Sequence, residues 1–277
     1  MNINNEIRNI DIYELAKSKK NMNFLGFEIS ADYGHFRKYY TTSSPLTFSV
    51  IPRTALIGII SAIIGIPKDE FGKNSKKYFE LMDPKNTILA LKIINPIKKI
   101  RIAINLLDCK EDGTRTNIFK DISKLKEPIK IARTQVNTEF LKNPKYKVFI
   151  SIEDKNYYQD LKYKLENRLS VYTPYMGLSF CLLNFKYIGE YEILDLKTNY
   201  KGAFDTIIDI ENIEDIELEN KFYLKEKVSY LMDESRKTIL YKNFLFEADA
   251  QSIKATLKNA LALKDKKTNE ITEISIF

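Results

Sequence analysis

The chain has 277 residues and a formal net charge of +7, long enough to bury one large core or two smaller ones. Its two cysteines, Cys109 and Cys181, are far apart, and no CxxC, HExxH or histidine cluster occurs, so we expect no disulfide framework, no metal site and no cofactor. The longest apolar run, residues 55–66, is too short to cross a bilayer, and no signal peptide is recognisable, so we expect a cytoplasmic protein.

Taken in order, the first part of the chain alternates apolar and polar segments. Residues 1–21 are rich in Asn and Lys, and we expect an N-terminal extension that stays mobile unless a partner docks on it. Residues 22–30 are apolar at nearly every position, as in a central strand covered on both faces. A polar loop follows, then Pro52, an apolar helix over 55–64 and a more polar helix over 69–82.

The polar loop carries residue types that a single-stranded nucleic acid requires. It holds the only histidine of the chain, several cations and aromatic rings, and four consecutive hydroxyl residues at 41–44. Cations contact phosphates, rings stack on bases, and hydroxyls bond to sugars or base edges. The candidate RNA-binding residues of this loop are His35, Phe36, Arg37, Lys38, Tyr39 and Arg53. The alternatives are a plain solvated loop, rings packed on the first helix, and a carboxylate partner for Arg53.

A second group of candidates lies in a strongly basic segment. Residues 85–147 hold 15 Lys and Arg against 6 Asp and Glu, a local charge of +9 that leaves −2 for the rest of the chain. Strands are predicted over 87–94 and 100–107, with a return strand over 132–138. Such a basic excursion resembles a protruding hairpin more than a core element, with a solvated insertion as the alternative. Its best phosphate-binding candidates are Lys98, Lys99, Arg101, Arg115 and Arg133.

The next elements complete a repeating order. We predict a strand over 146–152, an amphipathic helix over 156–169, a turn over 174–179 and a strand over 180–188. With the elements before them, they give the order β-α-β-β-α-β. This order is that of a ferredoxin-like or RRM-like α+β domain, here with a hairpin inserted between its middle strands.

The composition changes after this domain. We place the RRM-like domain at residues 22–192 and a small β-rich C-terminal domain at 193–277. The stretch 205–219 has seven acidic residues and no basic one, so we expect the C-terminal domain to face away from any RNA.

Several segments resemble a known family. Residues 27–29 (FEI), 34–38 (GHFRK), 41–48 (TTSSPLTF) and 52–58 (PRTALIG) resemble the N-terminal signature of the CRISPR-associated Cas-five family, of the RAMP superfamily. Residues 133–136 (RTQV), 139–141 (EFL) and 143–146 (NPKY) resemble its subtype I-B branch, and 177–181 (GLSFC) resembles its glycine-containing loop before the last strand. The resemblance covers most of residues 22–192.

The resemblance implies a fold and a role. Members are subunits of Cascade, the RNA-guided surveillance complex of type I CRISPR antiviral defence. They have an RRM-like domain with a protruding thumb hairpin, bind the 5′ handle of the crRNA, cap the filament of backbone subunits and touch the large subunit, so that target DNA is an indirect partner. In this chain the thumb would lie within about residues 98–137, where the charge already predicts a hairpin. Gly177 and Ser179 of the glycine loop join the candidate RNA contacts.

A crRNA-processing endoribonuclease is the alternative function. The sister subtype I-C uses this family as a metal-independent nuclease, which needs a base for the 2′-hydroxyl and an acid for the leaving 5′-oxygen. The lysine-histidine pair associated with that activity does not occur near residues 100–140. A trio of His35, Lys38 and Tyr39 is the remaining candidate for such chemistry, and we predict a non-catalytic subunit. A general binder of acidic proteins is a third possibility.

Overall fold

The structure is a computed structural model of the whole chain. It describes residues 12–18, 22–41, 43–67, 69–70, 73–74, 76–107 and 133–277. Within these residues the protein is a mixed α/β fold made mostly of strands, with few helices, in agreement with the predicted combination of helices and sheet. None of the described helices is long and apolar enough to cross a membrane.

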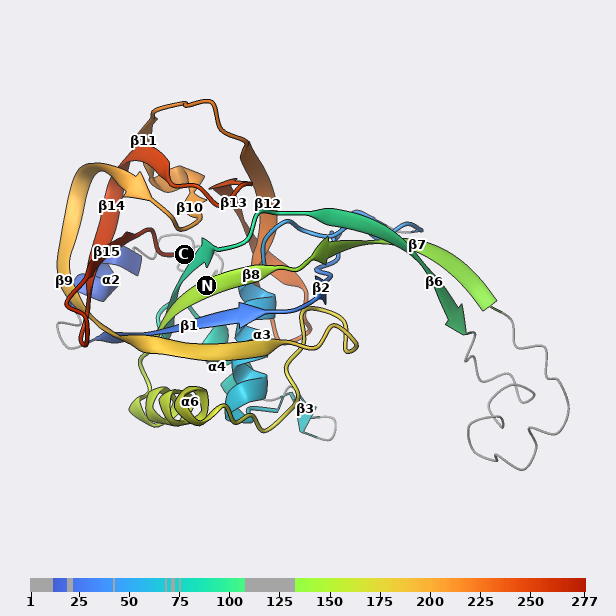
Figure 1. Cartoon of the computed structure of the whole chain (residues 1–277). Helices are drawn as coiled ribbons and strands as arrows, with labels where there is room; N and C mark the ends of the chain where they lie inside the picture. Colours follow the sequence, from blue (N-terminus) through green and yellow to red (C-terminus); the bar gives the residue numbers. More distant parts are fainter. Residues whose placement is uncertain are drawn as a thin grey trace, which may run out of the picture.

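An antiparallel sheet forms the centre of the molecule (Figure 1). Strand β1 (Asn23–Ser30) lies between β8 (Lys145–Ile152) and β9 (Asn184–Phe204), and β8 pairs on its other side with β5 (Thr87–Ile93). The predicted central strand is therefore confirmed. Because side chains alternate along a strand, Leu25, Phe27 and Ile29 enter one hydrophobic cluster while Phe24 enters another on the opposite face.

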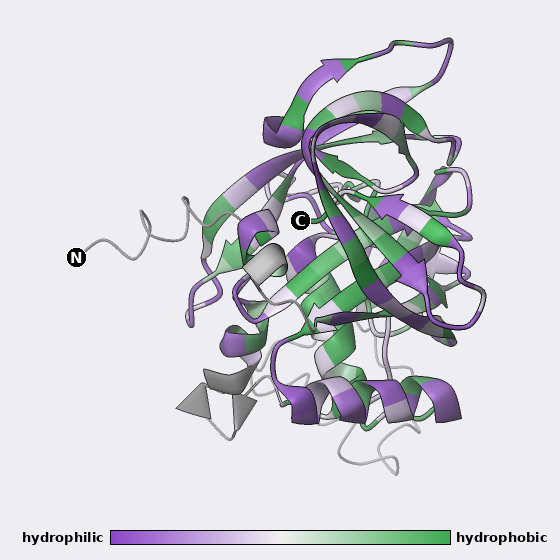
Figure 2. Ribbon diagram, turned by 90° about the vertical axis from the view of Figure 1, so that its left-hand side faces the viewer, coloured by the Kyte–Doolittle hydropathy of each residue, from purple (hydrophilic) through white to green (hydrophobic). Residues whose placement is uncertain are grey.

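Two helices cover one face of this sheet. Helix α3 (Arg53–Ile64) begins after Pro52 and ends at Gly65, whose φ of 88° is the left-handed conformation that glycine adopts easily. Helix α6 (Lys155–Asn167) is capped by the Asp154 carboxylate, which accepts from two main-chain amides. Figure 2 shows α6 as the lowest helix, with purple polar and green apolar segments alternating along it. Its buried residues, Tyr158, Leu161 and Leu165, recur at helical spacing. Both helices start and end within about two residues of their predicted positions.

A long hairpin leaves the sheet between β5 and β8. Strands β6 (Lys99–Leu107) and β7 (Arg133–Lys142) pair with each other, and the short β2 (Tyr33–Gly34) pairs with the base of β7. Figure 1 shows β6 and β7 curving away from the body. The predicted strands of this hairpin are confirmed, and β7 continues four residues beyond its predicted end.

The C-terminal segment forms two groups of strands. Strands β14 (Ile253–Asp265), β15 (Ile271–Ile274) and β11 (Ile213–Ile216) extend the central sheet beyond β9. Strands β12 (Tyr223–Met232) and β13 (Thr238–Glu247) form a hairpin, joined at one edge by β10 (Ile208–Asp209), which the one-turn helix η2 (Ile210–Asn212) follows.

The structure does not divide the chain at the predicted domain boundary after residue 192. Strand β9 passes straight through this position and pairs with β1 in its first half and with β14 in its second. Val228, Phe244 and Phe277 belong to the same hydrophobic cluster as β1 and α3. The two parts of the chain share one core. The change of composition near residue 192 is therefore not a boundary between two domains.

Two further predictions are corrected. Residues 12–18 of the expected extension form helix α2 (Ile12–Ser18), in which the Tyr13 hydroxyl lies 3.2 Å from Ser275 Oγ and accepts from Ile276 N. The single helix predicted over 69–82 is instead strands β3 (Asp69–Glu70) and β4 (Lys73–Asn74) followed by helix α4 (Lys76–Met82). In the first case a distant segment supplies the packing that the local sequence lacks.

Candidate nucleic-acid interface

Three segments far apart in sequence meet where the hairpin leaves the body: the first loop (residues 31–50), the base of β7, and the glycine turn (residues 174–183). Main-chain bonds join them, from His35 N to Met176 O at 3.0 Å and from Glu139 N to Pro45 O at 2.9 Å. Gly177 has a φ of 86°, and a Cβ added there would lie 1.8 Å from His35 O. A glycine is therefore required at this contact, as the sequence predicted for a tight turn.

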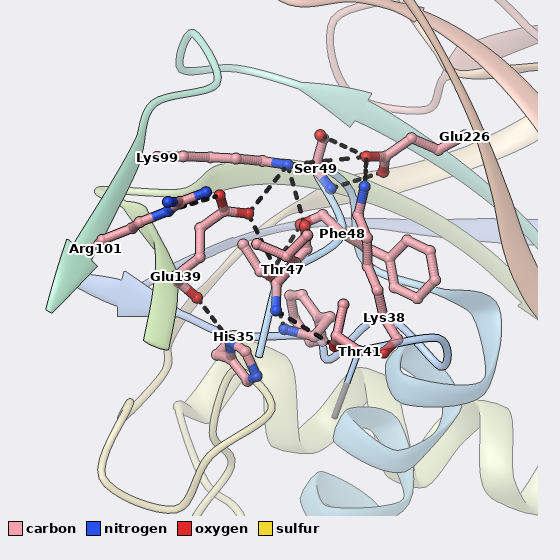
Figure 3. A network of polar contacts seen from close by, with 12 residues as sticks. His35, Lys38, Thr41, Thr47, Phe48, Ser49, Lys99, Arg101, Glu139 and Glu226 are labelled. Carbon is pink, nitrogen blue, oxygen red and sulfur yellow. Dashed lines mark hydrogen bonds and ion pairs between the residues drawn. The ribbon is translucent and has the colours of Figure 1, made fainter. Parts of the chain in front are cut away.

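A network of polar contacts fills this junction (Figure 3). The Glu139 carboxylate accepts from Thr47 N at 3.2 Å, and its main-chain oxygen lies 2.7 Å from His35 Nδ1. Lys99 Nζ donates to Thr47 O at 3.0 Å and lies 3.7 Å from Glu139 Oε1. Arg101 Nε, two residues further along β6, lies 4.0 Å from Glu139 Oε2. The hairpin base is thus fixed to the first loop through side chains of both strands.

Glu226 of β12 closes the network from the C-terminal side. Its carboxylate accepts from Lys38 Nζ at 2.9 Å and from Ser49 N at 2.7 Å and Ser49 Oγ at 2.9 Å, and it lies 3.8 Å from Lys99 Nζ. The C-terminal segment therefore lies directly against the candidate RNA-binding loop. The expectation that it faces away from this site is wrong, because tertiary packing, and not the acidic stretch 205–219, decides where β12 lies.

The junction changes the proton affinity of its ionisable groups. Burial lowers the pKa of His35 below its ordinary value, although the Glu139 main-chain oxygen opposes this effect. Burial also lowers the pKa of Lys99, against the two carboxylates beside it. Burial acts in the same sense on Lys38, but the Glu226 carboxylate outweighs it and raises the pKa of Lys38. We therefore expect a neutral imidazole at His35 near pH 7.

Three of the candidate RNA contacts are buried, which corrects their prediction. His35 is 4% exposed and Phe36 is 5% exposed, so neither ring is open to a base. Arg53 is completely buried and donates to the main-chain oxygens of Met82, Thr87 and Phe277, with its guanidinium 5.2 Å from the centre of the Tyr230 ring. Because it is completely buried, no phosphate reaches this cation, and its hydrogen-bond partners are the main-chain oxygens named above.

The other candidates in the first loop divide into two groups. Lys38 is engaged by Glu226 and is largely buried. Arg37 is exposed, and its guanidinium donates to Thr41 O at 2.8 and 3.2 Å. Tyr39 is exposed over 53% of its surface and contacts the Tyr40 and Tyr241 rings.

The hairpin candidates also differ in their surroundings. Lys98 is exposed, and the Arg101 side chain is 72% exposed, whereas Lys99 is held inside the network. Arg115 lies outside the described residues. Arg133 pairs with Leu107 at the far end of the described hairpin, and its side chain is not described. In the glycine turn, Gly177 and Ser179 are both at the surface.

Sequence reasoning missed an apolar groove beside the hairpin. Because side chains alternate along a strand, Ile102 and Ile104 lie on the same face of β6. Together with Phe140, Phe180 and Leu182 they line a cavity of about 270 Å³. Phe180 is 63% exposed and its ring centre lies 6.2 Å from that of Phe140. Residues 100–106 (IRIAINL) place apolar residues at every second position, which was the available signal. This pattern predicted a strand but did not predict a partly exposed apolar face.

The described side chains contain no group of three or more His, Cys, Asp or Glu residues that would hold a metal ion. Cys181 is buried, and burial raises the pKa of its thiol.

No family model and no curated protein sequence matches the chain. Solved structures with a similar fold include a CRISPR protein from Archaeoglobus fulgidus, with 12% identity over 91% of this chain and 98% of that one and a TM-score of 0.49. A chain of a CRISPR RNA-guided surveillance complex has 12% identity over 83% of this chain and 91% of its own, with a TM-score of 0.45. A chain of a type III-B Cmr-beta complex has 11% identity over 83% and 86%, also with a TM-score of 0.45. These three solved structures are of proteins from CRISPR systems.

Proposed function

We propose that this protein is a non-catalytic, RNA-binding subunit of a CRISPR effector complex of the Cascade kind, which binds the 5′ handle of a crRNA at the hairpin β6–β7. One observation carries the proposal: parts of the first loop, of β7 and of the glycine turn that resemble the Cas-five family meet at the hairpin base. His35, within residues 34–48, contacts Glu139 O of residues 139–146, bonds to Met176 O directly before residues 177–181, and lies against Gly177. If the resemblance were due to chance, segments this far apart in sequence would not be expected to lie together at the hairpin base.

The order of strands supports an RRM-like body with a thumb. Over β1, α3, β5, β8, α6 and β9 the chain follows the order β-α-β-β-α-β, and the sheet order β9-β1-β8-β5 is the order 4-1-3-2 of ferredoxin-like domains. The hairpin β6–β7 leaves between the second and third strands of this unit. We assign it as the thumb that the resemblance implies.

Charge and exposure support RNA as the ligand of this surface. Lys98 and Arg101 at the hairpin base and Arg37 on the first loop are exposed cations on neighbouring elements. Further lysines and Arg115 belong to the intervening residues 108–132. Cations that neutralise phosphates release counterions, so binding through them weakens steeply with salt.

The absence of catalysis in this proposal rests on the state of the histidine. The imidazole of His35 is buried, its Nδ1 bonds to Glu139 O, and burial lowers its pKa. Lys38, the second member of the candidate trio, is paired with Glu226. A general base must reach the 2′-hydroxyl of the RNA, and this histidine does not reach the surface.

The resemblance extends the proposal to partners. By analogy with the Cas-five family, the protein belongs to subtype I-B, caps the filament of Cascade backbone subunits and contacts the large subunit, with target DNA bound by the assembled complex. The direct test is to recover the RNA and proteins that accompany a tagged copy from its host. Short RNAs of one length with a shared 5′ end support the proposal, whereas an acidic protein without RNA contradicts it.

A binding experiment tests the surface itself. We expect the double variant Lys98→Ala/Arg101→Ala to bind repeat RNA about tenfold more weakly at low salt and with a flatter salt dependence. The matched control, Lys155→Ala/Lys258→Ala, removes two exposed lysines from α6 and β14 and should bind as the unmodified protein does. Equal salt slopes for the two double variants would overturn the assignment.

A cleavage experiment tests the non-catalytic assignment. Purified protein is incubated with repeat RNA in EDTA, and we expect the RNA to stay intact. Cleavage at one position that disappears in His35→Ala would instead identify a metal-independent endoribonuclease.

A further inference from the structure

A row of aromatic rings crosses from the first loop to the C-terminal hairpin. The ring centres of Tyr40 and Tyr39 are 5.2 Å apart, and those of Tyr39 and Tyr241 of β13 are 5.1 Å apart. Lys227 Nζ of β12 lies 5.2 Å from the centre of the Tyr241 ring. We call these four residues the tyrosine row. Its members come from segments about 200 residues apart, so the chain must be folded before the row exists.

The rings of this row are accessible from solvent. Tyr39 is 53% and Tyr40 is 60% exposed, Lys227 is exposed and Tyr241 is partly buried. The planes of neighbouring rings are inclined by 89° and 53°, so the rings meet edge to face or tilted and do not stack flat on one another. The exposed parts of Tyr39 and Tyr40 are the surfaces that a base can reach. Neighbouring exposed aromatic rings on a folded protein are more informative than single exposed apolar residues, because together they form a patch.

Contacts with the protein interior fix the position of the row. The centres of the Tyr39 ring and the buried Phe48 ring are 6.5 Å apart, and Lys38, next to Tyr39 in sequence, is bound to Glu226 of β12. Glu226 also accepts from Ser49 N, so this acid faces the interior and its charge is compensated. The residues directly before and after it, Lys225 and Lys227, lie on the opposite face of β12 and are exposed. The surface around the rings therefore combines fixed aromatic groups with positive charge.

We propose that the tyrosine row is a stacking platform for unpaired RNA bases, with Lys227 contacting a phosphate of the same strand. The inference rests on the proposed function, because the row begins in the first loop and continues the RNA path from the hairpin base onto β12 and β13. Aromatic rings stack on bases of any sequence, and adjacent lysines bind the connecting phosphates. Three rings would accommodate about three nucleotides.

A protein partner is the competing occupant, since tyrosine is also frequent at protein interfaces. Two observations favour RNA. Lysine is depleted in the cores of protein interfaces, and here Lys227 lies beside the Tyr241 ring. The nearest acid on β12, Glu226, is turned inward toward Lys38 and Ser49, and the pocket that Lys227 and Tyr241 line holds Glu211 together with a second lysine, Lys242.

The chain contains no tryptophan, which allows a direct spectroscopic test. Tyr241→Trp introduces a single indole at the centre of the row, and Tyr163→Trp introduces one on α6, where Tyr163 is 59% exposed. Repeat RNA is titrated into each protein. We expect strong quenching of the fluorescence in Tyr241→Trp, at the concentration where RNA binds, and none in Tyr163→Trp. Equal responses of the two indoles would overturn the proposal.

Affinity measurements give an independent readout. Tyr39→Ala/Tyr241→Ala should bind the same RNA about tenfold more weakly, whereas Tyr163→Ala should bind within about twofold of the unmodified protein. Lys227→Gln should reduce the slope of log K against log salt by about 0.7. An unchanged thermal midpoint for each variant establishes that binding, and not folding, has changed.

The outcomes separate this inference from the proposed function. If Lys98→Ala/Arg101→Ala weakens RNA binding and the tyrosine double variant does not, the hairpin site stands and the platform is rejected. If neither variant weakens binding, both proposals are rejected. If the tyrosine double variant keeps its RNA affinity but loses a protein that accompanies the unmodified chain, the row is a protein interface and the inference is overturned.

Discussion

Lys98 and Lys99 are neighbours in sequence, yet the two sides of the hairpin base give them different roles. Lys99 Nζ bonds to Thr47 O and lies within 4 Å of the carboxylates of Glu139 and Glu226, while Lys98 is exposed. Arg53 and Arg101 differ in the same way, since one is wholly buried and the other is largely exposed. The inner cations, Lys99 and Arg53, are held by contacts within the protein, with 28% of the Lys99 side chain still exposed, whereas the outer cations, Lys98 and Arg101, are open to a polyanion.

We expect the largest loss of stability when the most buried cation, Arg53, is replaced. Arg53→Met keeps the side chain's length but leaves the main-chain oxygens of Met82, Thr87 and Phe277 without their donor. Because unsatisfied buried acceptors retain their desolvation cost, we expect a loss of about 3–5 kcal/mol in the free energy of unfolding. Urea denaturation measures it. Arg101→Met is the control, and a similar loss there would erase the distinction between inner and outer cations.

The contact between the glycine turn and the first loop should give the next largest effect. Gly177→Ala places a Cβ against His35 O in a backbone with a φ of 86°. Since both the conformation and the close approach disfavour a side chain, we expect a loss of about 2–3 kcal/mol in stability. Thermal and urea unfolding provide the measurement. A variant as stable as the parent would mean that the turn does not lie against His35.

Removing the charge of Glu226 should have an intermediate effect. In Glu226→Gln the amide no longer compensates Lys38, although it can still accept from Ser49, so we expect a loss of about 1–2 kcal/mol. The control is Glu217→Gln, which removes an exposed ion pair with Lys201 and should cost less than about 0.5 kcal/mol. Equal losses in the two variants would contradict the inner role of Glu226.

The smallest effect concerns pH. Burial holds the pKa of His35 below 6.5 in the folded protein, so the unfolded chain takes up its proton first as the pH falls. The stabilisation is complete above pH 6.5 and decreases below it. The chain has one histidine, so His35→Asn should flatten the dependence of unfolding free energy on pH between 7.5 and 5.5. An identical slope in both proteins would show that the imidazole is not buried in solution.

Much of the central fold was predictable from local patterns. The apolar run at 22–30 predicted β1, and the spacing of apolar residues predicted α3 and α6 nearly to their ends. The position of the hairpin followed from charge and from alternation over 100–107. These signals depend on which face of an element is buried, and that information lies within a few residues along the chain.

The candidate site was predicted less well, because burial depends on distant partners. Phe36 and Arg53 are of residue types that often bind nucleic acid, but both are buried in this fold. The glycine turn lies against Phe36, and Tyr230 and Phe277 of the C-terminal segment lie against Arg53. Tyr241 was not a candidate at all, since it becomes neighbour to Tyr39 only when β13 packs beside the first loop.

The sequence by itself determined most of the order of strands and helices, the place of the basic hairpin and the turn over 174–179. Only the tertiary structure decided which cations are internal, where β12 lies and how the aromatic rings are grouped. The physical reason is the range of the interactions. Periodicity and backbone conformation act between near neighbours, whereas burial, ion pairing and ring contacts join residues that the chain brings together from any distance.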